Sequence, residues 1–320
     1  LSPGDTRLAQ VVAPSAAAPG APHRMHGLAG QPGEMLTNRL PDEILQPGEG
    51  RVRALIVSGG NPVVAFPDQA KTEEALAALD LLVVIDHRMT ALADVADYVI
   101  APRLALERAD VPHIMDRRFP APYTNYSPAV VDTDDDLVAE WEVFAGIAAR
   151  NGTEIDLPGG PIPHADGALA ADLDDDDVLD LVYGSARLPM AEIRRHRGVI
   201  HEDRRVTVVA GDPDADARFA VAPDDVVAEL LAVRAEQTGA EMLAGYRDAD
   251  LPFRLVSRRM KHVINSLGRE LPGLAAVGTT NPAFLHPDDL EALGVVDGDL
   301  IRIESLHGAV TGVAVAAADV

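Results

Sequence analysis

The stretch Ala54-Leu-Ile-Val-Ser-Gly-Gly-Asn-Pro62 begins with a continuous apolar run and ends in a turn. Two similar apolar runs follow along the chain, Leu81-Leu-Val-Val-Ile85 before Asp86 and Tyr98-Val-Ile-Ala101 before Pro102. Apolar runs of this length are typical of strands that are buried on both faces of a parallel sheet. The sequence therefore predicts an α/β fold built around a Rossmann-like parallel sheet.

Helical patterns alternate with these strands. Residues 68–80 contain helix-forming residues with apolar side chains at positions 75, 76 and 79. Thr90 is placed to cap a short helix that runs through Ala96. Residues 137–150 predict an amphipathic helix, and Asn151-Gly152 supplies the signal that ends it.

Composition divides the chain into three segments. Residues 1–50 are rich in Pro, Gly and Ala and predict a connector or extended arm with little regular structure. Residues 51–250 contain the predicted α/β domain and an acidic helical segment, which includes a helix-like run at 225–238. Residues 251–320 predict the start of a β-barrel domain, because residues 300–305 and 310–315 alternate like paired strands.

The charge balance is strongly acidic, with 27 Lys and Arg residues against 51 Asp and Glu residues and a net charge of −24. This balance disfavours nucleic acid and anionic membrane surfaces as partners, because both require a basic face on the protein. The absence of Cys excludes disulfides, thiolate metal ligands, iron–sulfur ligands and a cysteine nucleophile within these residues. No apolar run reaches the roughly 18 residues of a membrane-spanning helix, and no signal-peptide pattern opens the sequence.

Candidate binding residues follow the first two predicted strands. The loop Gly59-Gly60-Asn61 allows a phosphate to approach backbone N–H groups, because its glycines carry no Cβ. Asp86 is placed to accept hydrogen bonds from a ribose hydroxyl or from the paired N–H donors of a guanine edge. Both features also have a structural interpretation, as a tight strand-to-helix turn and as a helix N-cap or solvated strand end. The missing third glycine of the dinucleotide fingerprint disfavours an ordinary NAD-linked dehydrogenase.

Three charged clusters lie elsewhere along the chain. Glu107-Arg108 follows the third strand on the same rim, and a surface ion pair is its alternative interpretation. The basic run Ser257-Arg-Arg-Met-Lys-His262, followed by Asn265-Ser266, suits a pyrophosphate or an anionic ring system, with a basic surface loop as the alternative. Asp174-Asp-Asp-Asp177 lacks the ligand spacing and central Gly of a calcium loop and predicts a solvated acidic loop.

Several of these segments, taken in order, resemble the molybdopterin oxidoreductases, the dimethyl-sulfoxide-reductase superfamily that includes formate dehydrogenases and nitrate reductases. The resemblance is carried by the three strand segments between residues 54 and 102, by Glu107, and by Glu140-Trp-Glu-Val-Phe with Ala148-Ala-Arg-Asn-Gly152. Residues 255–266 and 285–299 are similar to the opening of the family's dinucleotide-binding barrel, whereas residues 160–250 match loosely.

The resemblance implies a molybdenum or tungsten ion held by two molybdopterin guanine dinucleotides. On this basis Gly59, Gly60 and Asn61 would lie along one dinucleotide, and Asp86 would contact its guanine or ribose. Arg108 and Glu140 would be further contacts on the same nucleotide. Contacts to a pterin or a phosphate would come from the C-terminal segment, at Ser257, Arg259, Asn265 and Ser266.

The resemblance also implies what would lie outside this chain. The protein ligand of the metal and any 4Fe-4S cluster would precede Leu1, and the barrel would continue beyond Val320. We therefore expect the C-terminal part of a longer enzyme, without a catalytic residue or a metal ligand in this segment. Expected partners are a small-molecule substrate and an electron-transfer subunit, and the expected location is the cytoplasm, with periplasmic export left open. The alternative function is a non-catalytic nucleotide-binding or assembly module on the same fold.

Overall fold

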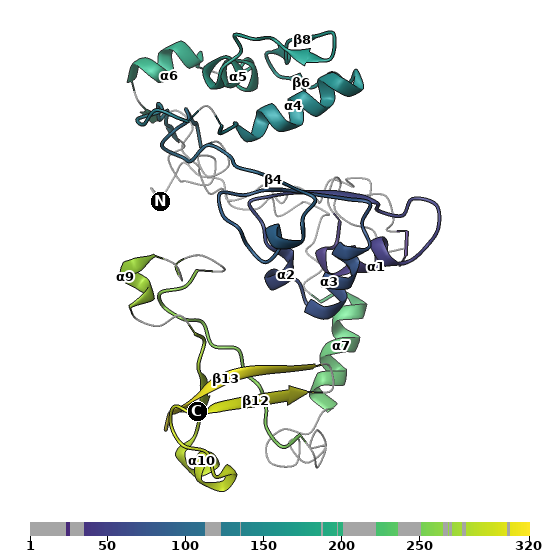
Figure 1. The fold of residues 1–320 in the computed structure, drawn as a ribbon, viewed down its shortest axis with the longest axis vertical. Helices are drawn as coiled ribbons and strands as arrows, with labels where there is room; N and C mark the ends of the chain where they lie inside the picture. The colour runs from purple at the N-terminus through teal and green to yellow at the C-terminus, as the bar shows by residue number, and fades with distance from the viewer. Residues whose placement is uncertain are drawn as a thin grey trace, which may run out of the picture. The chain divides into compact units, whose positions relative to one another are not determined.

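The computed structural model describes residues 24–25, 35–112, 123–134, 136–186, 188–196, 198–200, 222–235, 251–264, 268, 271–276, 280–305 and 308–320. The chain forms two compact units, residues 1–217 and residues 218–320 (Figure 1). The domain boundaries predicted at residues 50 and 250 stay predictions. None of the helices in the described residues combines the length and the apolar character that a membrane crossing requires.

A three-stranded parallel sheet lies at the centre of the first unit and confirms the predicted α/β fold. Its strands are β2 (Ala54–Ser58), β3 (Leu81–Ile85) and β4 (Tyr98–Ile100), in the order β2-β3-β4. Ala54 pairs with Leu81, and Val83 pairs with Tyr98. The carboxyl ends of all three strands therefore meet at one edge of the sheet, which we call the carboxyl edge.

Short helices cover one face of this sheet (Figure 1). The helices α2 (Pro62–Ala65) and α3 (Gln69–Ala77) follow β2, and the 3-10 helix η2 (Ala93–Val95) follows β3. The predicted cap at Thr90 is two residues too early, because the N-cap of η2 is Leu92, although Thr90 Oγ1 accepts a hydrogen bond from the Ala93 amide. Burial of each large apolar side chain contributes about 1.5–3 kcal/mol, and the shared core consists of Val63, Leu76, Leu82, Val84, Leu92 and Ala93.

The prediction of little regular structure in residues 1–50 is wrong at residues 37–45, where η1 (Thr37–Arg39) and α1 (Leu40–Leu45) form and α1 packs on α3. Two acidic side chains of α1 are buried because distant cations pair with them. Glu43 is 2% exposed and accepts a hydrogen bond from Arg24 Nε at 3.1 Å. Asp42 Oδ1 lies 2.5 Å from Lys71 Nζ on α3. Residues 1–23 and 26–34 lie outside the described residues.

The predicted amphipathic helix is α4 (Glu140–Asn151), and Gly152 ends it with a left-handed φ of 67° as predicted. The helix begins at Glu140 rather than at residue 137 because Val138 is used in another pairing. Val138 forms a parallel bridge with Pro102, and its carbonyl accepts a hydrogen bond from the Arg103 amide at 2.9 Å. Val138 therefore pairs with the loop after β4 and is not part of the helix.

The acidic run at residues 174–177 is not the predicted solvated loop but the start of α5 (Asp175–Val182). Asp174 is the N-cap, and its carboxylate accepts a hydrogen bond from the Asp177 amide at 2.9 Å. Acidic residues in a first helical turn are favoured by the partial positive charge of that terminus. A second hydrophobic core contains Val111 together with Met190 and Ile193 of α6 (Met190–His196). Leu179 of α5 packs against it.

The described residues of the first unit also form three two-stranded antiparallel pairs. They are β5 (Tyr123–Thr124) with β10 (Val199–Ile200), β6 (Asp156–Leu157) with β7 (Gly160–Pro161), and β8 (His164–Ala165) with β9 (Ala168–Leu169).

The second unit contains a mixed three-stranded sheet in the order β11-β13-β12. Its elements are α7 (Asp224–Ala235), α9 (Pro272–Ala275), β11 (Ala283–Leu285), α10 (Pro287–Leu293), β12 (Leu300–Ser305) and β13 (Gly308–Ala316). The antiparallel pairing of β12 with β13 confirms the two predicted alternating strands, and β13 also pairs in parallel with β11. Within the described residues these strands form an open sheet, not a closed barrel, so the truncated barrel stays a prediction.

Candidate dinucleotide-binding edge

The carboxyl edge brings the glycine loop and Asp86 side by side, as the parallel register predicts. The Gly59 amide donates a hydrogen bond to the Ile85 carbonyl at 3.0 Å, which joins the loop after β2 to the end of β3. The Asp86 amide donates to the Ile100 carbonyl at 3.1 Å, which joins the end of β3 to the end of β4. The residues that follow the three strands are therefore held together by main-chain hydrogen bonds.

The loop at residues 59–61 has the geometry of a close-approach turn. Gly59 has a φ of 61°, a left-handed conformation that other residues adopt at a cost, and a Cβ built on it would meet no heavy atom of the described residues within 4 Å. The carbonyl of Asn61 accepts hydrogen bonds from the amides of Val64 and Ala65, which begins α2. The side-chain Oδ1 of Asn61 is buried and has no hydrogen-bond partner among the described residues. Open space beside Gly59 and an acceptor without a partner leave capacity for a ligand.

Asp86 holds a nearly buried carboxylate at this edge, with 11% of its side chain exposed. Its Oδ1 accepts a hydrogen bond from the Arg88 amide at 3.1 Å and lies 3.5 Å from His87 Nδ1. Within the described part of the chain, the polar contacts of this carboxylate all use Oδ1. Oδ2 is thus the atom that is available to accept from an external N–H or hydroxyl group.

A shared carboxylate connects the carboxyl edge to the first residue of α4. Glu140 Oε1 accepts a hydrogen bond from Ser58 Oγ at 2.5 Å, and Glu140 Oε2 accepts one from Arg108 Nη1 at 3.3 Å. Arg108 Nη2 lies 3.9 Å from Asp110 Oδ2, so two acids face this guanidinium. The neighbouring Glu107 is used locally, because its Oε2 accepts from the Leu104 amide at 2.6 Å. The structure therefore brings predicted residues Arg108 and Glu140 together beside the loop.

A polar network that was not predicted from the sequence lies behind this edge. Arg103 follows β4 and pairs with Glu142 of α4 at 3.1 Å and with Asp175 of α5 at 3.4 Å. Asp175 also accepts a hydrogen bond from Trp141 Nε1 at 2.7 Å. The partners lie 34 to 72 residues apart, so no local sequence pattern could reveal them. The network joins α4 and α5 through Arg103.

A second network links α5 to α6. Arg194 pairs with Asp176 at 3.1 Å and with Asp180 at 2.9 Å, and its guanidinium lies 5.7 Å from the centre of the Tyr126 ring. The Tyr126 hydroxyl donates to Asp176 at 3.2 Å. Burial, together with this hydrogen bond and the charge of Asp176, raises the pKa of Tyr126 above its ordinary value.

The predicted residues of the C-terminal segment belong to the second unit. Ser257 and Arg259 are exposed, whereas Asn265 and Ser266 lie outside the described residues. The neighbouring Arg258 is used within the unit, because its guanidinium stacks 4.4 Å from the centre of the Phe284 ring and pairs with Asp319 at 4.0 Å. Of these two adjacent arginines, Arg259 is therefore the one whose side chain is available to a ligand, as far as the described residues of this unit show.

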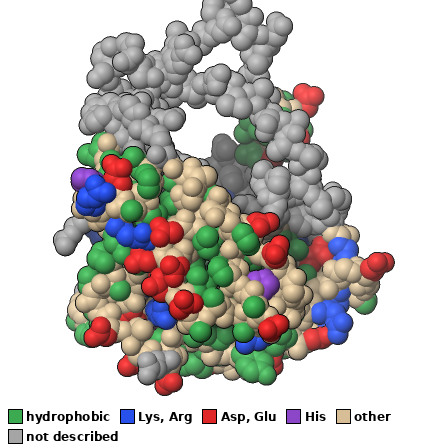
Figure 2. All heavy atoms as spheres, turned by 90° about the horizontal axis from the view of Figure 1, so that it is seen from above, with side chains coloured by type: hydrophobic (Ala, Val, Ile, Leu, Met, Phe, Trp, Pro, Cys, Tyr) green, Lys and Arg blue, Asp and Glu red, His purple; other side chains and the backbone are tan. Residues whose placement is uncertain are grey.

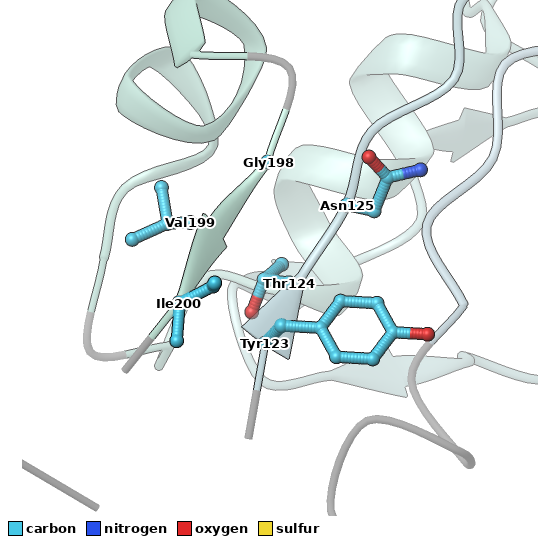
Figure 3. A pocket seen from close by; sticks show the side chains of 6 residues that line it. All are labelled: Tyr123, Thr124, Asn125, Gly198, Val199 and Ile200. Atoms are coloured by element: carbon cyan, nitrogen blue, oxygen red, sulfur yellow. The ribbon is translucent and has the colours of Figure 1, made fainter. Parts of the chain in front are cut away.

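The rest of the described surface adds no further candidate. A pocket between β5 and β10 is lined by Tyr123, Thr124, Asn125, Gly198, Val199 and Ile200, none of them a predicted site residue (Figure 3). On the face shown in Figure 2, the basic side chains lie among acidic ones rather than in a separate patch. In the described stretches, no three His, Asp or Glu side chains are grouped as metal ligands.

Comparison with known proteins identifies two family models. Residues 15–150 match the model described as molybdopterin oxidoreductase, and residues 253–320 match the model described as molydopterin dinucleotide binding domain. The first match includes every predicted site residue from Gly59 to Glu140. The second includes Ser257, Arg259, Asn265 and Ser266.

Individual relatives are considerably longer than this chain. The F420-dependent formate dehydrogenase 1 subunit alpha of Methanococcus maripaludis is 32% identical over 113 residues, which cover 35% of this chain and 16% of that protein. The dimethyl sulfoxide/trimethylamine N-oxide reductase of Cereibacter sphaeroides is 24% identical over 274 residues, which cover 78% of this chain and 32% of that protein. Among solved structures, acetylene hydratase from Pelobacter acetylenicus has the same fold, with a TM-score of 0.59 and 18% identity over 89% of this chain and 38% of that chain.

Proposed function

Because the chain belongs to the molybdopterin oxidoreductases, we propose that it forms the cofactor-binding part of an oxidoreductase that holds molybdenum or tungsten through two molybdopterin guanine dinucleotides. The chain spans about a third or less of the length of the relatives described above. The activity proposed for the whole enzyme is a formate dehydrogenase-like or reductase-like reaction. When bound, the metal–pterin group supplies the redox chemistry, and the residues of this chain bind and orient that group.

The observation that carries the proposal is the set of open positions at the carboxyl edge. A Cβ built on Gly59 meets no heavy atom of the described residues within 4 Å, Asn61 Oδ1 is buried without a described partner, and Asp86 presents Oδ2. In open α/β sheets, ligands bind outside the carboxyl ends of the strands. A guanine edge carries adjacent N–H donors, and a nearly buried carboxylate is the acceptor that matches them. The residues present therefore fit one end of a guanine dinucleotide.

Each residue of the edge has a distinct part in this proposal. Asp86 accepts hydrogen bonds from guanine or ribose, and the Gly59–Asn61 loop lies along the nucleotide. Arg108, which pairs with Glu140 and lies near Asp110, offers guanidinium N–H donors to a phosphate group. In the second unit, Ser257, Arg259, Asn265 and Ser266 remain predicted contacts to a pterin or phosphate. The methanococcal relative is named as an alpha subunit, which supports a further subunit as partner; the electron-transfer role of that subunit stays a prediction. The predicted iron–sulfur cluster and cytoplasmic location stay predictions.

The proposal is tested on the protein purified at the full length that its gene encodes. Metal analysis should find molybdenum or tungsten, and acid hydrolysis should release guanine nucleotide in a fixed ratio to protein. Dye-linked assays with formate, dimethyl sulfoxide and trimethylamine N-oxide, the substrates in the relatives' names, then test the activity. Stoichiometric protein without guanine nucleotide or either metal would refute the proposal. Guanine nucleotide without metal or turnover would instead support the non-catalytic module.

A further inference from the structure

Glu140 joins three segments that are far apart in the sequence, at the start of α4. Its partners are Ser58, which lies 82 residues away at the end of β2, and Arg108, which lies 32 residues away in the loop after β4. Ser58 directly precedes Gly59, so the hydrogen bond to Ser58 acts on the first residue of the ligand-binding loop. The Glu140 carboxylate therefore connects the Gly59–Asn61 loop, the Arg108 guanidinium and helix α4.

We propose that Glu140 is a positioning residue, which couples the Gly59–Asn61 loop to Arg108 instead of contacting the nucleotide itself. This inference rests on the function proposed above. Oε1 accepts the Ser58 hydroxyl at 2.5 Å and Oε2 accepts Arg108 Nη1 at 3.3 Å, so both oxygens are engaged within the chain. A direct contact with guanine or ribose would have to displace one of these two partners.

The electrostatics of the edge support this role. Asp86, Asp110 and Glu140 all lie near the predicted path of an anionic dinucleotide, and another exposed carboxylate there would repel phosphate. Pairing with Arg108 neutralises Glu140, while its place at the first residue of α4 is favoured by the helix dipole. Arg108, whose side chain is 33% exposed, is in turn held by Glu140 Oε2. Glu140 thus holds both the Arg108 guanidinium and the Gly59–Asn61 loop in place.

The test measures how fast guanine nucleotide leaves the full-length holoenzyme under mild denaturant. Losing a hydrogen bond to a charged group costs roughly a factor of ten or more in an equilibrium or rate. We expect Glu140→Ala and Ser58→Ala each to speed release about tenfold. Because both variants break the same connection, the double variant should release the nucleotide about as fast as either single variant, not about a hundredfold faster. Glu140→Gln should restore slow release, since an amide can accept from Arg108 and donate to the Ser58 oxygen.

A matched control lies on the same helix. Glu142 pairs with Arg103 at 3.1 Å, so Glu142→Ala breaks an ion pair of α4 without touching Ser58 or Arg108. We expect this variant to release nucleotide at a rate near that of the wild type. Equal acceleration by Glu142→Ala, additive effects of the two alanine variants, or failure of Glu140→Gln to restore slow release would each overturn the inference. Wild-type protein without guanine nucleotide would overturn the proposed function and, with it, the coupling.

Discussion

Replacing Asp86 with alanine tests the carboxylate that we propose accepts hydrogen bonds from the nucleotide at the carboxyl edge. The substitution removes a nearly buried acceptor whose Oδ1 is held by the Arg88 amide at 3.1 Å. The loss of that local hydrogen bond costs about 1 kcal/mol of folding stability. A ligand N–H pair that loses its charged acceptor costs about 1.5–3 kcal/mol more in binding. We therefore expect guanine nucleotide affinity to fall about ten- to a hundredfold.

Two further variants separate binding from folding. Asp86→Asn retains an oxygen for the Arg88 amide, but its NH₂ group opposes the donors of a guanine edge, so its affinity should fall as far as that of Asp86→Ala. Asp94 is exposed on η2 and serves as the matched control, since Asp94→Ala should leave affinity unchanged. The assay compares guanine nucleotide per protein after equilibrium dialysis, with thermal unfolding measured in parallel. Full nucleotide occupancy in Asp86→Asn would refute the role assigned to this carboxylate.

Three other predictions follow from the described geometry. Gly59→Ala should lower the free energy of unfolding, measured by urea titration, by about 1–2 kcal/mol because Gly59 has a left-handed φ. Gly60→Ala is the control and should lower it less, because its Cβ would lie at an ordinary 3.4 Å from its nearest neighbour. Asp175→Ala removes the hydrogen bond to Trp141, the only tryptophan of the sequence. It should lower the free energy of unfolding by about 2–3 kcal/mol and alter the tryptophan emission spectrum. An unchanged spectrum would contradict the contact. Tyr126 should ionise above its ordinary pKa of 10.0, so its stabilising contribution is present below that pH and is lost as the pH rises through the raised pKa. Absorbance titration of the wild type against Tyr126→Phe checks this, and a phenolate step at the ordinary pKa would contradict it.

The parallel sheet was predictable because each of its strands is marked by a short, continuous apolar run in the sequence. The second strand was predicted at residues 81–85 and forms there, and the loop and Asp86 follow their strands at one edge, as any parallel sheet requires. That single rule placed Gly59, Asn61 and Asp86 together without knowledge of their contacts. Their roles toward a nucleotide remain predictions.

The elements that were missed depend on partners distant in the sequence. Helix α1 was interpreted as part of a connector because residues 1–50 are rich in Pro, Gly and Ala, and its buried Glu43 is paired with Arg24, 19 residues earlier. The start of α4 was placed too early because the helical pattern of residues 137–139 is overridden by the pairing of Val138 with Pro102. Propensity and periodicity describe neighbours along the chain, whereas these choices are decided by tertiary contacts.

The strand order of the second unit has a consequence for its synthesis. β13 is the last of the three strands in the sequence but the middle one in the sheet, with β11 on one side and β12 on the other. Neither neighbour can form a ladder until residues 308–316 have left the ribosome, so this sheet must assemble late. In the first unit, β2, β3 and β4 pair in the order in which they are made, and each can join the growing edge as it emerges.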